Sequence, residues 1–91
     1  MNVVWLANAL QSRNEQIRYI AQDNPTAALG QLARILRRID ILEEFPKSGL
    51  YQSETDSFRL AVADTPFIAL YRIRRDRIEI FRFVHGKQKP L

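Results

Sequence analysis

Cysteine is absent from this sequence of 91 residues, and histidine and glycine are scarce, with one and three copies. Without cysteine, neither a disulfide framework nor a thiolate metal site can form, and one histidine with scattered acids does not supply a usual zinc or calcium site. The glycines, Gly30, Gly49 and Gly86, are too far apart to form a phosphate-binding loop or a dinucleotide fingerprint. We therefore expect neither a metal nor another cofactor.

Long apolar runs are absent as well. No wholly apolar run is longer than that from Phe67 to Tyr71, whereas a membrane-spanning helix needs about 20 residues. The first residues lack the basic stretch followed by an apolar segment that marks an export signal. Together with the absence of cysteine, this pattern predicts a cytoplasmic protein that does not bind a membrane.

The composition, with 46% hydrophobic and 26% charged residues, is typical of a globular protein, and the length fits a single domain over residues 1–91. The excess of positive charge lies at one end. Residues 72–91 contain seven Lys or Arg against two acids, while residues 1–71 contain seven against eight. An isoelectric point near 10.0 favours an anionic partner, and charge alone leaves open whether this is a nucleic acid or an acidic protein segment.

Two helical patterns follow a short β-branched segment, Asn2–Trp5, that we interpret as a first strand. The face of the first helix is formed by Leu6, Leu10, Arg13, Ile17 and Ile20. The second helix is expected to begin after Asn24, because Asn is a favoured N-cap and Pro25 fits the first helical position. It should extend to about Phe45, with an apolar face made of Ala28, Leu32, Ile35, Ile39 and Leu42, and Leu29 and Leu36 alongside. The short connection predicts an antiparallel helical hairpin.

Three alternating segments, residues 58–63, 67–73 and 77–84, are predicted to be strands. The preceding residues 50–57 are mostly polar, have no period and are expected to form a surface loop. In the last strand, alternation places Ile78, Ile80, Arg82 and Val84 on one face and Arg77, Glu79, Phe81, Phe83 and His85 on the other. The predicted order is β-α-α-β-β-β, which is an α+β fold.

A cationic group remains as the candidate for chemistry: Arg59, Arg72, Arg82, His85, Lys87 and Lys89. Metal-free RNA cleavage needs a base for the 2′-hydroxyl, cations for the phosphorane charge and an acid for the leaving oxygen. Arg59, Arg82 and His85 meet that minimum. In the alternative interpretation, His85 only begins the turn after the strand, and the cations are solvated or pair with an acidic partner.

Several short motifs occur in a characteristic order along the chain. They are Val4-Trp5 with Ala9, Tyr19-Ile20-Ala21, Asp23-Asn24-Pro25, Phe45-Pro46 with Gly49, Arg59-Leu60 with Val62, Thr65-Pro66-Phe67-Ile68, Leu70-Tyr71-Arg72-Ile73 and Val84-His85-Gly86. Over nearly the whole chain this order resembles the RelE/ParE superfamily of type II toxin-antitoxin modules. The resemblance implies a helical hairpin packed on a small, curved, largely antiparallel sheet. It also implies a bacterial cytoplasmic setting and a cognate antitoxin that wraps and neutralises the toxin.

The superfamily has two activities. RelE-like members cut mRNA in the ribosomal A site, whereas ParE-like members poison DNA gyrase and are not nucleases. The nucleases typically carry Arg near the position of Ile68 and basic residues in the preceding loop, but residues 50–57 hold no Lys or Arg. Thr65-Pro66-Phe67-Ile68 and Val84-His85-Gly86 resemble the ParE-like branch, although Lys89 replaces an aromatic residue often seen before the terminal Pro.

The resemblance therefore predicts a ParE-like toxin that inhibits DNA gyrase by protein-protein contact. A RelE-like ribosome-dependent mRNA endoribonuclease is the alternative, and an inactive antitoxin-binding relic is a third possibility. The predicted target contacts are Arg72, Arg82, His85, Lys87 and Lys89, and Arg59 is expected to steady the sheet. In the nuclease alternative, Arg59, Arg82 and His85 are the catalytic residues.

The expected antitoxin is an extended chain with acidic and apolar residues that covers the helical hairpin and a sheet edge. The residues predicted to bind it are Leu10, Arg13, Ile17 and Tyr71. The chain itself is not expected to bind DNA sequence-specifically.

Overall fold

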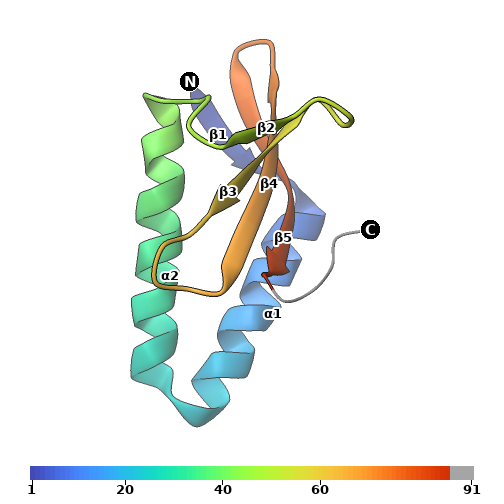
Figure 1. The fold of residues 1–91 in the computed structure, drawn as a ribbon. Coiled ribbons are helices and arrows are strands. Elements are labelled where there is room, and N and C mark those ends of the chain that lie inside the picture. The colour runs from blue at the N-terminus through green and yellow to red at the C-terminus, as the bar shows by residue number, and fades with distance from the viewer. Residues whose placement is uncertain (87–91) are drawn as a thin grey trace.

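The computed structural model describes residues 1–86. Two helices pack on one face of a five-stranded sheet (Figure 1). In chain order the elements are β1 (Asn2–Trp5), α1 (Ala7–Asp23), α2 (Pro25–Asp40), the 3₁₀ helix η1 (Ile41–Glu43), β2 (Leu50–Gln52), β3 (Ser57–Ala61), β4 (Phe67–Arg74) and β5 (Arg77–His85). The strand order is β1-β5-β4-β3-β2, with β1 parallel to β5 and the other pairs antiparallel. The predicted α+β fold is confirmed.

The helical hairpin turns at Asn24, as predicted. The Asn24 side-chain oxygen accepts a hydrogen bond from the Ala27 backbone N–H at 3.0 Å, and Pro25 occupies the first position of α2. The α-helix ends at Asp40 and continues only as the 3₁₀ turn of η1, so it is shorter than predicted. Its buried face is also narrower, because Leu29 is 69% exposed and Leu36 is 40% exposed.

Residues 50–57 do not form the predicted loop throughout. Leu50–Gln52 is strand β2, which pairs with β3 and forms the edge of the sheet. Tyr51 pairs with Phe58, and their ring centroids are 5.2 Å apart. A three-residue strand has no readable period, and its pairing depends on a partner strand that lies nearby only in the folded chain.

A β-bulge in β5 corrects the predicted faces of the last strand. Tyr71 pairs with Ile80 while the preceding residue, Leu70, pairs with Arg82, so Phe81 is an extra residue in β5. The alternation therefore holds up to Ile80 and is reversed after the bulge. Consequently Phe83, predicted to lie opposite Ile78 and Ile80, joins the same buried core, with an exposed fraction of 1%.

The core lies between the helices and one face of the sheet. It combines helical and strand residues: Ala9, Ile35, Ile39, Leu42, Phe58, Leu60, Val62, Phe67, Ala69, Tyr71, Ile78, Ile80 and Phe83. The opposite face, which we call the open face, is not covered by the helices. In the part of the chain that the structure describes, no helix has the length and apolar character needed to cross a membrane.

Candidate functional site

A cationic row and an apolar row of side chains cross the open face. Arg59 pairs with Leu70, and Leu70 pairs with Arg82, so the cationic row runs across β3, β4 and β5. Residues that face each other in neighbouring strands project from the same side of a sheet. Arg72 lies two residues beyond Leu70 on the same side and pairs with Glu79. The register therefore brings three of the predicted cationic residues together.

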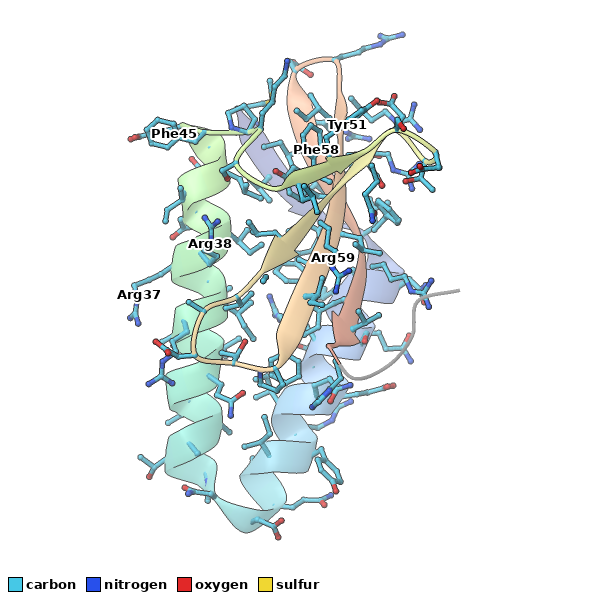
Figure 2. All side chains as sticks on the ribbon, viewed as in Figure 1. Arg37, Arg38, Phe45, Tyr51, Phe58 and Arg59 are labelled. Carbon is cyan, nitrogen blue, oxygen red and sulfur yellow. The ribbon has the colours of Figure 1, made fainter. Side chains whose placement is uncertain are left out.

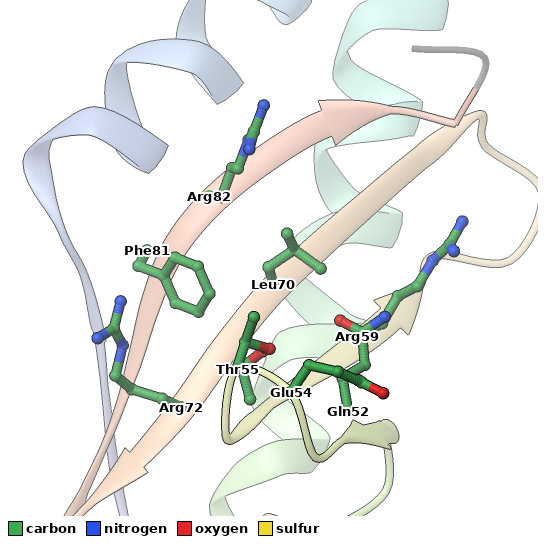
Figure 3. A pocket seen from close by; sticks show the side chains of 9 residues that line it. Gln52, Glu54, Thr55, Arg59, Leu70, Arg72, Phe81 and Arg82 are labelled. Carbon is green, nitrogen blue, oxygen red and sulfur yellow. The ribbon is translucent and has the colours of Figure 1, made fainter. Parts of the chain in front are cut away.

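These arginines border a pocket of about 430 Å³ (Figure 3). Its lining consists of Gln52, Glu54, Thr55, Ser57, Arg59, Leu70, Arg72, Phe81 and Arg82. The first four belong to β2, β3 and the turn that joins them, so the strand missed in the sequence forms one wall. Glu54 is the one acidic residue in this lining, against three arginines.

Arg72 is held by an aromatic contact within the pocket. Its guanidinium carbon lies 4.1 Å from the centre of the Phe81 ring, which is a cation–π distance. The Arg72 Nε atom is buried and has no hydrogen-bond partner among the described residues. Within residues 1–86 the ion pair of the structure joins Arg77 and Glu79, so Arg59, Arg72 and Arg82 have no carboxylate partner there.

His85 does not join these arginines. It pairs with Phe67, which is 2% exposed and belongs to the core, and its ring meets the Phe67 ring edge-on at 5.9 Å. The pairing places His85 on the helix-facing side of the sheet, whereas Arg59 and Arg82 lie on the other side. The structure thus unites two members of the predicted catalytic group and separates the third.

Next to the cationic row lies an apolar row. Ile68, at the position where the nucleases of the superfamily typically carry Arg, pairs with Ala61 on one side and Val84 on the other. This row therefore adds no cation to the open face. Two further predicted target contacts, Lys87 and Lys89, lie outside the described residues.

The predicted antitoxin contacts on α1 form a partly exposed stripe of Leu10, Arg13 and Ile17. The Arg13 guanidinium lies 4.7 Å from the centre of the Trp5 ring and donates hydrogen bonds to the Asn14 side chain at 3.1 and 3.3 Å. Burial lowers the pKa of Arg13 from its ordinary value. Arg13 thus combines an apolar neighbour with a charge that stays available on the surface of α1.

Tyr71, the fourth predicted antitoxin contact, is a core residue. Its side chain is fully buried, stacks on Phe58 at 5.1 Å and leaves no surface for a partner. The hydroxyl donates to the Pro46 carbonyl at 2.8 Å and accepts from the Gly49 N–H at 3.0 Å. A Cβ at Gly49 would lie 2.9 Å from this hydroxyl, so the loop can approach so closely because glycine has no side chain. Tyr71 fixes the loop that leads into β2.

Several pocket residues are not predicted from the sequence. Alternation places Phe81 on the side away from Ile80, as the structure has it, but it does not predict the contact with Arg72. Gln52, Glu54 and Thr55 lie in residues 50–57, which the sequence predicts to be a surface loop. The sequence feature that marks this segment is an absence, since residues 50–57 contain no Lys or Arg. Among residues 1–86, no group of three or more His, Asp or Glu side chains is arranged to hold a metal ion.

Comparisons with known proteins identify the family of this chain. A family model described as the ParE toxin of the type II toxin-antitoxin system, parDE, matches residues 3–90. A Sinorhizobium fredii protein named as a candidate toxin, Y4kP, is 39% identical over 85 residues, covering 93% of this chain and 88% of that protein. A solved chain of the chromosomal ParDE TA system from P. aeruginosa has the same fold, with a TM-score of 0.84, 19% identity, and coverage of 96% of this chain and 97% of that chain. The predicted resemblance is confirmed, and the chain belongs to the ParE toxin family of type II toxin-antitoxin systems.

Proposed function

We propose that this toxin inhibits DNA gyrase by protein-protein contact in the bacterial cytoplasm, and that Arg72 and Arg82 on the open face take part in that contact. The observation that carries the proposal is the position of His85. Because it faces the helices, the arginines of the open face have no histidine beside them to move a proton. A cationic surface with no histidine and a single carboxylate, that of Glu54, fits electrostatic recognition of a protein better than RNA cleavage.

The apolar row supports the same choice. RNA cleavage requires cations around the phosphate, whereas Ala61, Ile68 and Val84 extend the open face with aliphatic side chains. Arginines beside aliphatic side chains are typical of protein interfaces, in which a polar rim surrounds an apolar centre. The RelE-like alternative retains Arg59 and Arg82 in one pocket and is therefore tested in parallel.

Neutralisation is proposed to occur through a cognate antitoxin that binds along α1 at Leu10, Arg13 and Ile17. These side chains are partly exposed and follow a helical spacing, which suits helix-in-groove or extended docking of an apolar and acidic segment. A partner that binds only the folded toxin stabilises it by about 2.7 kcal/mol at a concentration of 100 times its Kd. The product of a neighbouring short reading frame should therefore raise the melting temperature of the toxin.

The target is tested by adding purified toxin to gyrase and relaxed plasmid, beside a ribosome-dependent mRNA cleavage assay. We expect loss of supercoiling without mRNA cleavage, and a weaker effect for Arg82→Gln. Arg37→Gln is the matched control, because it also removes one positive charge but lies on the outer side of α2 (Figure 2). Normal supercoiling together with cut mRNA would refute gyrase as the target.

A further inference from the structure

The open-face pocket is a prepared site for negative charge that no partner in the described chain fills. Three arginines border it, and none forms an ion pair within residues 1–86. A guanidinium presents its donors in a planar fork that matches a carboxylate, with two parallel hydrogen bonds. The pocket has a size typical of ligand sites and combines these cations with the apolar side chains of Leu70 and Phe81.

Of the three arginines, Arg72 is the one with both an aromatic contact and a buried polar atom without a partner among the described residues. The contact with Phe81 holds its guanidinium in one place, and the buried Nε atom has given up water without gaining a hydrogen bond. Burying a polar group without a partner is unfavourable, and a side chain already held in place loses less entropy when it binds. A carboxylate that approaches this guanidinium therefore meets a fixed and poorly compensated charge.

From these features we infer that the pocket binds an acidic peptide segment with apolar side chains, with Arg72 as the anchor and Arg59 and Arg82 as flanking carboxylate contacts. The segment belongs to the neutralising partner, and this part of the inference rests on the proposed function. Occupation of the pocket covers the arginines that are proposed to meet gyrase. The antitoxin then blocks the toxin directly, in addition to binding α1.

The lining favours a peptide over a nucleic acid. Bases of single-stranded RNA bind proteins largely by stacking on exposed aromatic faces, but the guanidinium of Arg72 lies over the ring of Phe81. Glu54 in the wall would repel a chain of phosphates, whereas a peptide can place a neutral side chain there. Leu70 and Phe81 provide contacts for apolar side chains between the carboxylates.

The test uses the full-length toxin and a short fluorescein-labelled peptide of Glu and Leu residues, measured by fluorescence anisotropy. The same peptide with Gln in place of Glu and an oligouridylate of similar length are the comparison probes. We expect saturable binding of the acidic peptide, and at least about tenfold weaker binding, equivalent to about 1.4 kcal/mol, of the Gln peptide. Oligouridylate that binds more tightly than the acidic peptide would overturn the assignment in favour of a nucleic acid.

Variants locate the binding. Arg72→Gln and Arg82→Gln should each weaken the acidic peptide by about tenfold or more, and Arg37→Gln, on the outer side of α2, should leave its affinity unchanged. Phe81→Leu keeps all three charges and an apolar floor but removes the ring beneath Arg72, so a several-fold loss reports the held guanidinium rather than charge alone. If Arg72→Gln melts at a lower temperature, Arg82→Gln carries the test. Wild-type affinity in the pocket variants would overturn the inference.

The titration contains neither gyrase nor antitoxin, so it separates the two proposals. Peptide binding that depends on the pocket, together with unaffected supercoiling, would refute gyrase as the target and retain the pocket. Inhibited supercoiling together with peptide binding that ignores Arg72 and Arg82 would do the reverse.

Discussion

Replacing Tyr71 with Phe removes one oxygen atom and should loosen the loop that leads into β2. The hydroxyl joins the Pro46 carbonyl at 2.8 Å to the Gly49 N–H at 3.0 Å. The substitution keeps the ring and its stacking on Phe58, so the loss falls on the hydrogen bonds of the hydroxyl. An unsatisfied buried polar group costs about 1–3 kcal/mol. The Pro46 carbonyl and the Gly49 N–H are only partly buried, so each should cost about 1 kcal/mol, the lower end of this range. We therefore expect a total loss of about 2 kcal/mol in the free energy of unfolding.

For a domain of this size, 1 kcal/mol corresponds to about 4–8 °C in Tm. The Tyr71→Phe variant should therefore melt roughly 8–16 °C below the wild type in calorimetry or circular dichroism. Tyr19→Phe is the matched control, because Tyr19 is 70% exposed and should change Tm very little. Equal melting of the two variants would refute the role assigned to the hydroxyl.

Tyr71 also makes the free energy of unfolding depend on pH. Burial raises the pKa of Tyr71 above its ordinary value of 10.0, and the hydrogen bond from Gly49 opposes this shift. Because the unfolded chain then releases the proton at a lower pH than the folded chain, the stabilisation is complete below pH 10 and is lost as pH rises through the folded pKa. Urea unfolding between pH 9 and pH 11, about one unit either side of the ordinary tyrosine value, should show a shallower loss for Tyr71→Phe than for the wild type. An identical slope for both proteins would contradict the assignment.

Two further predictions concern the helical hairpin. Asn24→Ala removes the side-chain acceptor of the Ala27 N–H and should destabilise the protein by about 1 kcal/mol in chemical unfolding, whereas Asn8→Ala, exposed in α1, should change stability by less than about 0.5 kcal/mol. Arg13→Gln removes the cation from the ring of Trp5, the single tryptophan, and should shift its fluorescence emission and weaken antitoxin binding in a titration. An unchanged emission spectrum would show that the guanidinium does not rest on the ring in solution.

The sequence by itself determined the features that depend on neighbouring residues. The helical spacing from Leu6 onward, the cap at Asn24 and the alternation of residues 67–73 are local, and each predicted its element correctly. The order of short motifs was enough to identify the superfamily. Absences were informative as well, since Ile68 and the lack of Lys and Arg in residues 50–57 distinguished the ParE-like branch from the nucleases within the resemblance.

Only the tertiary structure decided which side chains meet. The bulge at Phe81 changes the side on which every later residue of β5 projects, and it arises from the pairing of β5 with β4, which no local pattern records. The burial of Tyr71 and the formation of β2 depend in the same way on partners far along the chain. Periodicity tells that a strand has two faces, whereas strand register and bulges determine which face each residue occupies. For this reason the cationic residues could be named from the sequence, but the pocket that joins Arg59, Arg72 and Arg82 and leaves out His85 could not.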